Sequence, residues 1–391
     1  MSESQVDLLH LAYGGFGGHQ SVVNTLNSAL TPLGIKTAVL GVTRSPDEQT
    51  NEGSWQSTRY FPIPSSHPVG GLSGRKFLKS LLSELNPRMI LAHTHGLVSE
   101  VMAKSRHSGR APFLVVREAH AIDLRSWKDN ARSLLALQHA SGVVFLSSEY
   151  RENFPLPLLS IKGRPVVAII PNSVEQPMRH AANVSPTEGP TRIGMATRLV
   201  PGKRVKLLID VAADLVRRGV EIELLIAGDG QERELLEDHA SSQLLPESVH
   251  FLGSVAPEKM PDFYSSLSIY VHLSDGEGES NALLEAAAHG LPIVVSQSEG
   301  IPDFMSQSGG VSLVANQVER ISEELFNLIN LGGELALRGQ TNAQLTLSER
   351  SVGATVNGYL EMFSVIDPQG PWSTARKNLE TLSSSLSIER E

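Results

Sequence analysis

The stretch of sequence that decides the fold is residues 274–292, SDGEGESNALLEAAAHGLP. An apolar, β-prone run at 268–273 precedes it, and a second buried strand is expected at 291–296. Ser280 is a suitable helix N-cap, and Gly290 is a suitable helix end because glycine adopts the left-handed conformation and the nearby proline cannot continue the helix. The stretch therefore predicts a unit of strand, acidic glycine-rich loop, helix and strand.

The predicted helix offers a place for an anion. Its first backbone N–H groups, near Asn281 and Ala282, should point to the carboxyl ends of the strands, where open α/β sheets bind ligands. Two carboxylates flank this point, Glu277 in the loop and Glu285 in the helix, and both could accept hydrogen bonds from sugar or ribose hydroxyls. An acidic surface loop before an ordinary amphipathic helix explains the spacing equally well.

The segment resembles the signature of retaining glycosyltransferases of family 4, which have the GT-B fold: glutamate, seven residues, glutamate, then Ala-x-Ala-x-Gly-x-Pro. The resemblance implies that Glu277 contacts the donor sugar and acts in catalysis, while Glu285 holds the nucleotide ribose. It also implies that backbone amides bind the donor diphosphate, at Ser280, Asn281 and Ala282.

Composition limits the classes of protein that fit. A length of 391 residues with 40% hydrophobic residues suits two soluble domains, and the absence of cysteine excludes disulfides and thiolate-bound metals. The net charge of −9 and the 5% aromatic content argue against a nucleic-acid partner. The sequence has neither a long apolar run nor the features of a signal peptide at its start, so we expect a cytoplasmic protein.

The first half begins as a doubly wound sheet. A strand at 6–11 leads through a glycine-rich turn into a helix at 20–30. NAD is not expected, because G-x-G-x-x-G is absent and the second strand, 36–42, ends without an acidic residue. Gly17 and Gly18 resemble the family's Gly-Gly pair facing the donor phosphate, although a tight turn explains glycines equally well.

Histidines follow two strands of this half. His93 and His95 share a face of an extended segment, but no carboxylate with ligand spacing accompanies them, so no metal site is expected. His120 follows the strand at 113–116. The resemblance implies that it lies beside the reacting sugar as a catalytic residue, and a histidine that caps the loop is the alternative.

The segment at 75–85 is expected to be helical and carries three cations. Some family members dock on membranes through a basic amphipathic segment in this domain, but three cations favour an ordinary solvated face. We therefore expect at most a weak peripheral membrane contact.

The second half opens with cations where a helix begins. A strand at 192–196 is followed by Arg198, Lys203 and Arg204, and then by an apolar-periodic helix at 205–217. Because the helix dipole disfavours cations there, Lys203 and Arg204 suggest that an anion binds. The run resembles the family's Gly-Arg-Leu-x-x-x-Lys-Gly, which implies that Arg198 and Lys203 neutralise the donor diphosphate. Thr197 and Arg204 stand where glycines are usual.

The predicted fold is therefore α/β and GT-B: two Rossmann-like doubly wound domains facing a central cleft, with a C-terminal helix crossing back to the first domain. Pro-Asn-Ser-Val at 171–174 resembles the motif that closes the first domain, and Gly300 to Asp303 resembles Gly-x-x-Glu. The expected parts are a first domain, a linker, a second domain, a returning segment and a tail that is either docked or disordered. Their ranges are 1–178, 179–191, 192–344, 345–365 and 366–391.

The resemblance implies a retaining hexosyltransferase that uses a UDP-sugar or GDP-sugar donor. Its acceptor would be a glycan, a glycolipid or a small-molecule glycoside. No cofactor or metal is expected, because Arg198, Lys203 and the helix N-terminus can stabilise the leaving diphosphate and no Asp-x-Asp occurs. Two alternatives remain: a GT-B nucleotide-sugar epimerase, and a non-catalytic GT-B subunit, although such subunits usually lose the charged donor residues present here.

Overall fold

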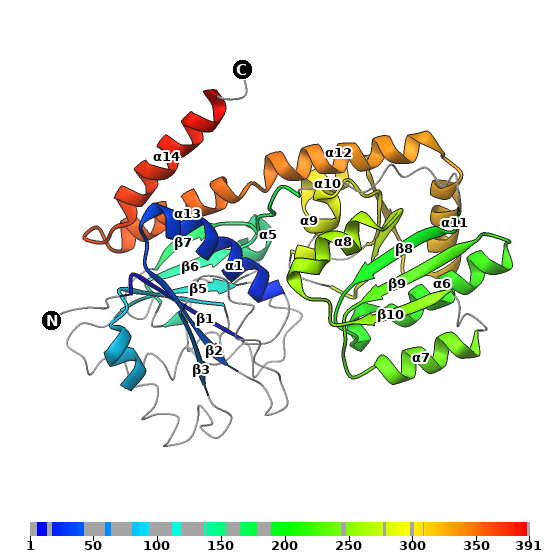
Figure 1. The fold of residues 1–391 in the computed structure, drawn as a ribbon, viewed down its shortest axis with the longest axis horizontal. Coiled ribbons are helices and arrows are strands. Elements are labelled where there is room, and N and C mark those ends of the chain that lie inside the picture. Colours follow the sequence, from blue (N-terminus) through cyan, green and yellow to red (C-terminus); the bar gives the residue numbers. More distant parts are fainter. Residues whose placement is uncertain are drawn as a thin grey trace. The chain divides into compact units, whose positions relative to one another are not determined.

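The computed structural model describes most of the chain, which divides into two compact units (Figure 1). Unit 1 is formed by Met1–Asn172 and Val352–Glu391, and unit 2 is formed by Ser173–Ser351. The described residues are 6–13, 18–42, 59–63, 80–93, 112–118, 137–138, 140–152, 154, 165–177, 189–243, 248–276, 279–297, 301–307 and 309–388.

Unit 1 contains a seven-stranded parallel sheet with the order β3-β2-β1-β4-β5-β6-β7. The chain winds outward from β1 in both directions, so the winding reverses between β1 and β4, which pair from Leu8 with Met89 onward. Its strands are β1 Leu8–Tyr13, β2 Thr37–Val42, β3 Arg59–Ile63, β4 Met89–Ala92, β5 Phe113–Glu118, β6 Gly142–Phe145 and β7 Val166–Ile169. Helix α1 (Gly18–Leu30) connects β1 to β2 through η1 (Thr31–Leu33), and the short α5 (Ser148–Glu152) follows β6.

Unit 2 contains a six-stranded parallel sheet with the order β10-β9-β8-β11-β12-β13, and here the winding reverses between β8 and β11. The strands are β8 Thr191–Ala196, β9 Ile222–Ala227, β10 Val249–Gly253, β11 Ile269–His272, β12 Ile293–Ser296 and β13 Val311–Val314. The longer helices are α6 Val205–Arg217, α7 Arg233–Ser242, α9 Asn281–Ala288, α11 Val318–Ile329 and α12 Gly333–Glu349. The short ones are η5 Pro201–Lys203, η6 Pro257–Lys259, α8 Met260–Ser265 and α10 Asp303–Gln307.

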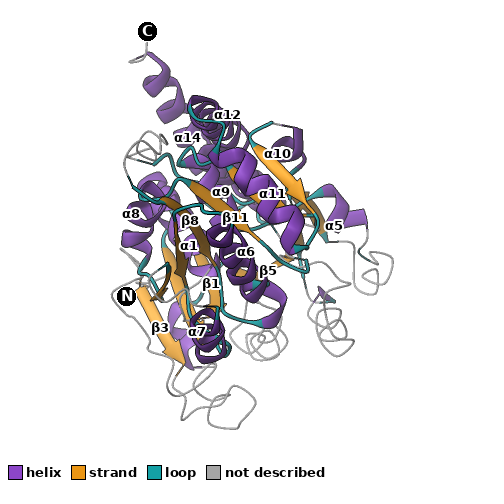
Figure 2. Cartoon of the chain, turned by 90° about the vertical axis from the view of Figure 1, so that its right-hand side faces the viewer, coloured by secondary structure: helices purple, strands orange, loops and turns teal. Residues whose placement is uncertain are grey.

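Helices cover both faces of the unit 2 sheet (Figure 2). One core joins the sheet to α6 and α11 through residues such as Leu208 and Leu325. The other joins it to α8 and α9 through residues such as Tyr264 and Leu284. Because both faces are buried, the strands read as continuous apolar runs, which is typical of parallel sheets. The predicted doubly wound α/β architecture is therefore present in both units.

The end of the chain belongs to unit 1. Helices α13 (Val352–Ile366) and α14 (Trp372–Ile388) contribute Phe363 and Trp372 to a core shared with β1 and β4. Asp367, which is 1% exposed, forms an ion pair with Arg88 at 3.0 Å. Part of the segment treated as a tail, 366–391, is thus a docked helix with a buried anchor.

The limits of unit 2 lie outside the expected range of 192–344. At one end Val174 pairs with Ser351, and at the other α12 continues to Glu349 because it packs on α9. That packing is close, since a Cβ atom on Gly339 would lie 1.9 Å from the Gly290 carbonyl oxygen. The return into unit 1 therefore begins at Val352 and not at 345, and residues 179–188 of the expected linker lie outside the described residues.

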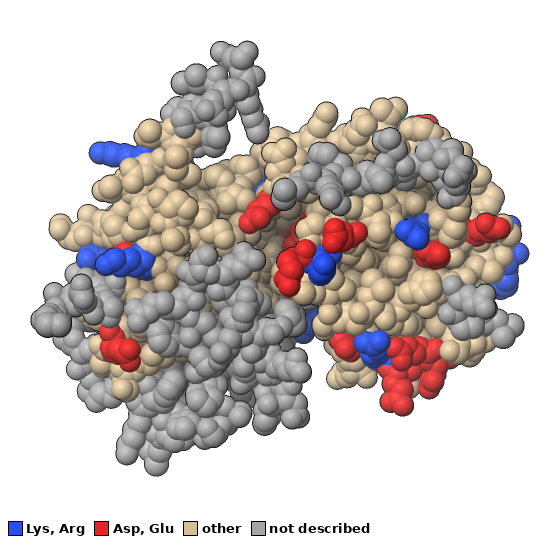
Figure 3. Space-filling view, in the orientation of Figure 1, with Lys and Arg blue, Asp and Glu red and all other residues tan. Residues whose placement is uncertain are grey.

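Two surface properties bear on partners. No helix in the described part of the chain is both long and apolar enough to cross a membrane. On the face drawn in Figure 3, acidic side chains gather at the edge of unit 2 where α7 lies. That edge would repel an anionic ligand.

Candidate functional site

The candidate site lies at the point of unit 2 where the winding of the sheet reverses. Strands β8 and β11 are parallel neighbours, with Ile193 beside Ile269 and Gly194 beside Tyr270. The chain leaves their carboxyl ends in opposite directions, which is where open α/β sheets form a ligand crevice. The two loops that follow are 197–204 and 273–280, the two segments singled out by the sequence.

These two loops are bonded to each other. The backbone N–H of Asp275 donates to the carbonyl of Gly202 at 3.0 Å, and Arg204 Nε lies 2.5 Å from Asp275 Oδ1. Both partners of the ion pair are 47% exposed, so we assign it no more than about 1 kcal/mol of stability. The backbone bond and the ion pair together fix where the first loop lies against the second.

Arg204 corrects one expectation. Its charge already has Asp275 as a counterion, so it does not require a bound anion, and the argument for one rests on Arg198 and Lys203. Arg204 also shows how the missing glycine is replaced, because its φ is 51°, in the left-handed region that glycine usually supplies. The arginine adopts the conformation at some cost in backbone strain.

Arg198 is an exposed cation of the first loop. Within the described ranges it has no ion pair and no side-chain hydrogen bond, while its backbone is fixed by a bond from Val200 N to its carbonyl at 2.9 Å. Lys203 is half-buried in η5, and its N–H donates to the Val200 carbonyl at 2.9 Å. A fixed backbone with an exposed guanidinium is suited to binding an anionic ligand.

A glycine-rich loop at 228–230 packs closely against the backbone of the Arg198 loop. A Cβ atom on Gly228, where φ is 136°, would lie 1.8 Å from the Thr197 carbonyl oxygen, and one on Gly230 would lie 2.4 Å from that of Leu199. Only glycine permits this approach. The Leu199 N–H donates to the Asp229 carbonyl at 3.0 Å and completes the support.

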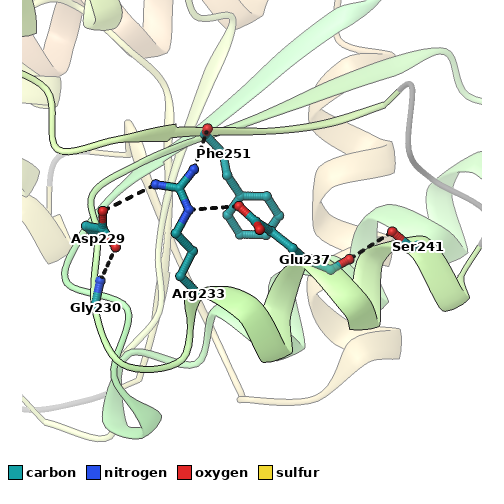
Figure 4. Close-up of polar contacts among 6 residues, drawn as sticks. All are labelled: Asp229, Gly230, Arg233, Glu237, Ser241 and Phe251. Carbon is teal, nitrogen blue, oxygen red and sulfur yellow. Dashed lines mark hydrogen bonds and ion pairs between the residues drawn. The ribbon is translucent and has the colours of Figure 1, made fainter.

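Arg233 holds the glycine-rich loop in place (Figure 4). Its guanidinium lies between Asp229, at 3.3 Å, and Glu237, at 2.8 Å, and it also donates to the Phe251 carbonyl at 3.5 Å. The side chain thereby joins the end of β9, helix α7 and strand β10. The sequence analysis did not predict this network.

Helix α9 has the predicted limits. The Ser280 side chain accepts a hydrogen bond from Leu283 N at 3.4 Å, and its φ of −79° and ψ of 119° are those of an N-cap. Gly290 ends the helix with a φ of 78°. The first turn, which includes Asn281 and Ala282, contains no acidic side chain, so its N–H groups and dipole face the site without a neighbouring helical carboxylate.

Glu285 is held by a residue that sequence reasoning missed. The Tyr264 hydroxyl donates to Glu285 Oε2 at 2.9 Å, and Tyr264 is only 1% exposed. Burial, and then the charge of Glu285, raises the pKa of Tyr264 well above its usual value, so the phenol stays a donor at neutral pH. Tyr264 comes from α8, and no local pattern could have linked it to α9.

Several predicted site residues are not placed. Gly17, His120 and Glu277 lie outside the described residues, so their assigned roles stay predictions. Gly18 is the first residue of α1, which follows β1 at the winding reversal of unit 1. Its role in donor binding is likewise untested.

The histidine pair considered for metal has only one described member. His93 stacks on His10, with His10 Nδ1 3.0 Å from His93 Nε2, and both rings are buried. His95 lies outside the described residues. Among the residues that are described, no cluster of three or more histidine or carboxylate side chains could bind a metal ion.

Comparison with known proteins finds a family match that includes this site. Residues 178–345 match the family described as glycosyl transferases group 1. The match includes both loops of the candidate site and helix α9.

Curated relatives bear glycosyltransferase names. EpsF of Bacillus subtilis (strain 168), named as a glycosyltransferase, is 26% identical over 318 residues, which cover 76% of this chain and 81% of EpsF. The phosphatidylinositol N-acetylglucosaminyltransferase GPI3 subunit of Saccharomyces cerevisiae (strain RM11-1a) is 26% identical over 230 residues, covering 55% of this chain and half of that subunit.

Solved structures establish the overall fold. The crystal structure of Anabaena Alr3699/HepE in complex with UDP and glucose matches with a TM-score of 0.74 at 17% identity, covering 92% of this chain and all of that one. Sucrose-phosphate synthase from Thermosynechococcus elongatus matches with a TM-score of 0.73 at 16% identity, covering 92% and 99% of the two chains. The prediction of a GT-B fold is confirmed.

Proposed function

We propose that this protein is a retaining hexosyltransferase of glycosyltransferase family 4. It transfers a hexosyl unit from a nucleotide-diphosphate sugar to a carbohydrate, glycolipid or small-molecule glycoside acceptor. The observation that carries the proposal is the pair of bonded loops after β8 and β11, one bearing the exposed Arg198 and the other leading into the capped helix α9. The likeness to a protein crystallised with UDP and glucose supports it.

Each site residue that the structure describes has a role in the proposed reaction. Arg198, Lys203 and the N-terminus of α9 bind the donor diphosphate and stabilise the charge that grows on it as it leaves. Glu285, oriented by Tyr264, accepts hydrogen bonds from the ribose hydroxyls. The bond from the sugar C1 to the diphosphate breaks with its electron pair going to phosphate, and the acceptor oxygen bonds to C1 on the same face. The acceptor proton leaves with the released nucleoside diphosphate.

Two features of the proposal rest on the sequence alone. His120 and Glu277 act beside the donor sugar, and neither is assigned as a covalent nucleophile. The reaction proceeds without a metal ion, because fixed cations and backbone dipoles supply the countercharge that a metal supplies in other glycosyltransferases.

The names of two relatives favour a lipid-linked acceptor. One matched subunit is named for phosphatidylinositol, and another relative is the alpha-monoglucosyldiacylglycerol synthase of Streptococcus pneumoniae (strain ATCC BAA-255 / R6), 26% identical over 98 residues. That match covers 25% of this chain and 22% of the synthase. A lipid-linked acceptor, met at the cytoplasmic face of a membrane, is therefore the first class to test.

The experiment has two stages. Thermal unfolding is measured with UDP-glucose, UDP-galactose, UDP-N-acetylglucosamine and GDP-mannose, and at a hundred times its Kd the true donor should stabilise the fold by about 2.7 kcal/mol. The best donor is then incubated with lipid-linked and soluble acceptors, and NMR of the product gives the anomeric configuration.

We expect an acceptor-linked product with the configuration of the donor. A free epimer without an acceptor-linked product would identify an epimerase, and an inverted product would contradict the retaining assignment. Failure of every nucleotide sugar to bind would leave a non-catalytic subunit as the better description.

A further inference from the structure

An ion pair stands directly before helix α9. Glu279 precedes the N-cap residue Ser280, and its side chain is only 7% exposed. Arg350 Nε lies 2.8 Å from Glu279 Oε1, and the Arg350 side chain is 15% exposed. The pair is thus more deeply buried than the exposed pair formed by Arg204 and Asp275 at the same site.

Arg350 is held from several directions. Its guanidinium carbon lies 4.8 Å from the centroid of the Phe304 ring, which belongs to α10, so the cation sits against an aromatic face. Its backbone N–H donates to Thr346 at the end of α12, and its carbonyl accepts from Val174 N at 3.0 Å. This arrangement places the positive charge beside Glu279 and leaves it little freedom to move.

The position of Glu279 creates an electrostatic conflict. A carboxylate next to a helix N-terminus is favoured by the helix dipole, and it competes with an external anion for the same positive potential. An unpaired Glu279 would therefore weaken the binding of a diphosphate at α9 by like-charge repulsion. Paired with Arg350, it contributes little net charge at that point.

We propose that Arg350 keeps the N-terminus of α9 receptive to a nucleoside diphosphate by neutralising Glu279. Arg350 is then a positioning and charge-balancing residue, and it need not touch the ligand. The inference rests on the proposed function, which places the donor diphosphate at this helix. The competing explanation is a structural tie between the loop and the end of α12, with no effect on ligand charge.

The two explanations predict different directions of change in nucleotide affinity for the two single variants. Calorimetry at low salt measures the Kd of UDP and GDP for wild type, Arg350→Gln, Glu279→Gln and the double variant. Arg350→Gln removes the positive charge beside Glu279, so the repulsion between the Glu279 carboxylate and the ligand is less balanced and binding of the preferred nucleotide should weaken about fivefold to tenfold. Glu279→Gln leaves a positive charge and should bind equally or more tightly, and the double variant should lie within about twofold of wild type. A structural tie predicts weaker binding in both single variants.

Matched controls separate charge from stability. Arg88 and Asp367 form a pair of similar burial and length in unit 1, at 3.0 Å with 16% and 1% exposure. Arg88→Gln and Asp367→Asn should lower the Tm, because they break a buried ion pair, without changing the Kd for UDP or GDP. Arg350→Lys covers the case in which Arg350→Gln does not fold. The lysine keeps the charge but loses the planar contact with Phe304, so the proposal predicts near-normal affinity and a structural tie predicts a loss.

The experiment distinguishes failure of this inference from failure of the proposed function. If wild-type protein binds neither UDP nor GDP, the proposed function fails and this inference fails with it. If wild type binds one of them and Glu279→Gln weakens binding as much as Arg350→Gln does, the inference alone is overturned. Opposite signs in the two single variants, with recovery in the double variant and a smaller difference at high salt, support it.

Discussion

The two sheets of this protein reverse their winding in the same way but differ in the chemistry at that point. In unit 1 the described residues next to the reversal include His10 and His93, which are buried and stacked on each other. In unit 2 the corresponding loops carry Arg198 and Lys203 and lead into the N-terminus of α9. The same topology therefore offers a cationic edge in one unit and a buried histidine pair in the other.

The difference shows that topology locates a ligand crevice while side chains decide what it binds. Burial lowers the pKa of His10 to about 3, so this ring is neutral at pH 7 and provides no charge for a phosphate. Arg198 instead supplies an exposed guanidinium cation, which only donates hydrogen bonds. We therefore assign the anionic half of the donor to unit 2.

The largest effect is expected at Arg198. Arg198→Ala removes a charge-assisted bond to the leaving diphosphate and should cost about 2 to 4 kcal/mol in the transition state, which lowers kcat/KM about thirtyfold to a thousandfold. The matched control is Arg192→Ala. Arg192 lies in strand β8, which leads into the Arg198 loop; it is half-exposed and paired with Glu223 at 2.8 Å, and its loss should leave turnover unchanged. Near-normal turnover of Arg198→Ala would break the assignment of the anion to unit 2.

The second effect concerns the buried pair of His10 and His93 in unit 1. Because the pKa of His10 is lower in the folded protein than in the unfolded chain, the unfolded chain binds the proton first as pH falls below 6.5. His10 should thus cost about 1.4 kcal/mol of stability per pH unit below that point, or about 2 kcal/mol at pH 5. Urea unfolding of wild type and His10→Gln between pH 7 and pH 5 measures it. The stability gap between them should narrow with falling pH, and a constant gap would show that folding does not lower the pKa of His10.

The third effect tests how Glu285 is held. Tyr264→Phe removes the hydrogen bond to its carboxylate, so the affinity for a nucleoside diphosphate should fall about threefold to tenfold, with a similar loss for the intact donor. Tyr270→Phe is the control, since Tyr270 is also buried in this core but bonds to the Ala196 backbone at 3.4 Å. Equal losses in both variants would indicate a general packing defect and not a role for Tyr264 at Glu285.

The features that the sequence predicted correctly depend on residues that lie close together in the chain. Helix α9 was found because its signals, Ser280 and Gly290, lie at its own ends, and the Arg198 loop was found because its motif is contiguous. The missed contacts join segments far apart. The bond from Tyr264 to Glu285 depends on how α8 packs on α9, and the counterion of Arg204 comes from another loop. No periodicity records such pairings.

The end of the chain illustrates the same limit. A Ser- and Glu-rich composition is typical of an exposed segment, yet Trp372 is fully buried and Asp367 pairs with Arg88. One aromatic anchor and one buried ion pair hold this segment, and Arg88, the partner in the ion pair, lies far back in the sequence. The average composition of a segment therefore does not reveal the few residues that decide whether it docks.

The smallest effect is expected from removal of metal. If the cationic edge of unit 2 supplies all the countercharge for the leaving diphosphate, then saturating EDTA should leave the rate of transfer within about twofold, whereas a metal acting as a Lewis acid would contribute several kcal/mol. The measurement uses metal-stripped protein and buffer, with Mg²⁺ and Mn²⁺ added back separately. A control with Arg198→Ala sharpens it, because a divalent cation could partly replace the lost charge and raise the rate of that variant while leaving wild type unchanged. Loss of wild-type activity in EDTA, with recovery on adding Mg²⁺ or Mn²⁺, would contradict metal independence and return attention to His93 and its neighbours in unit 1.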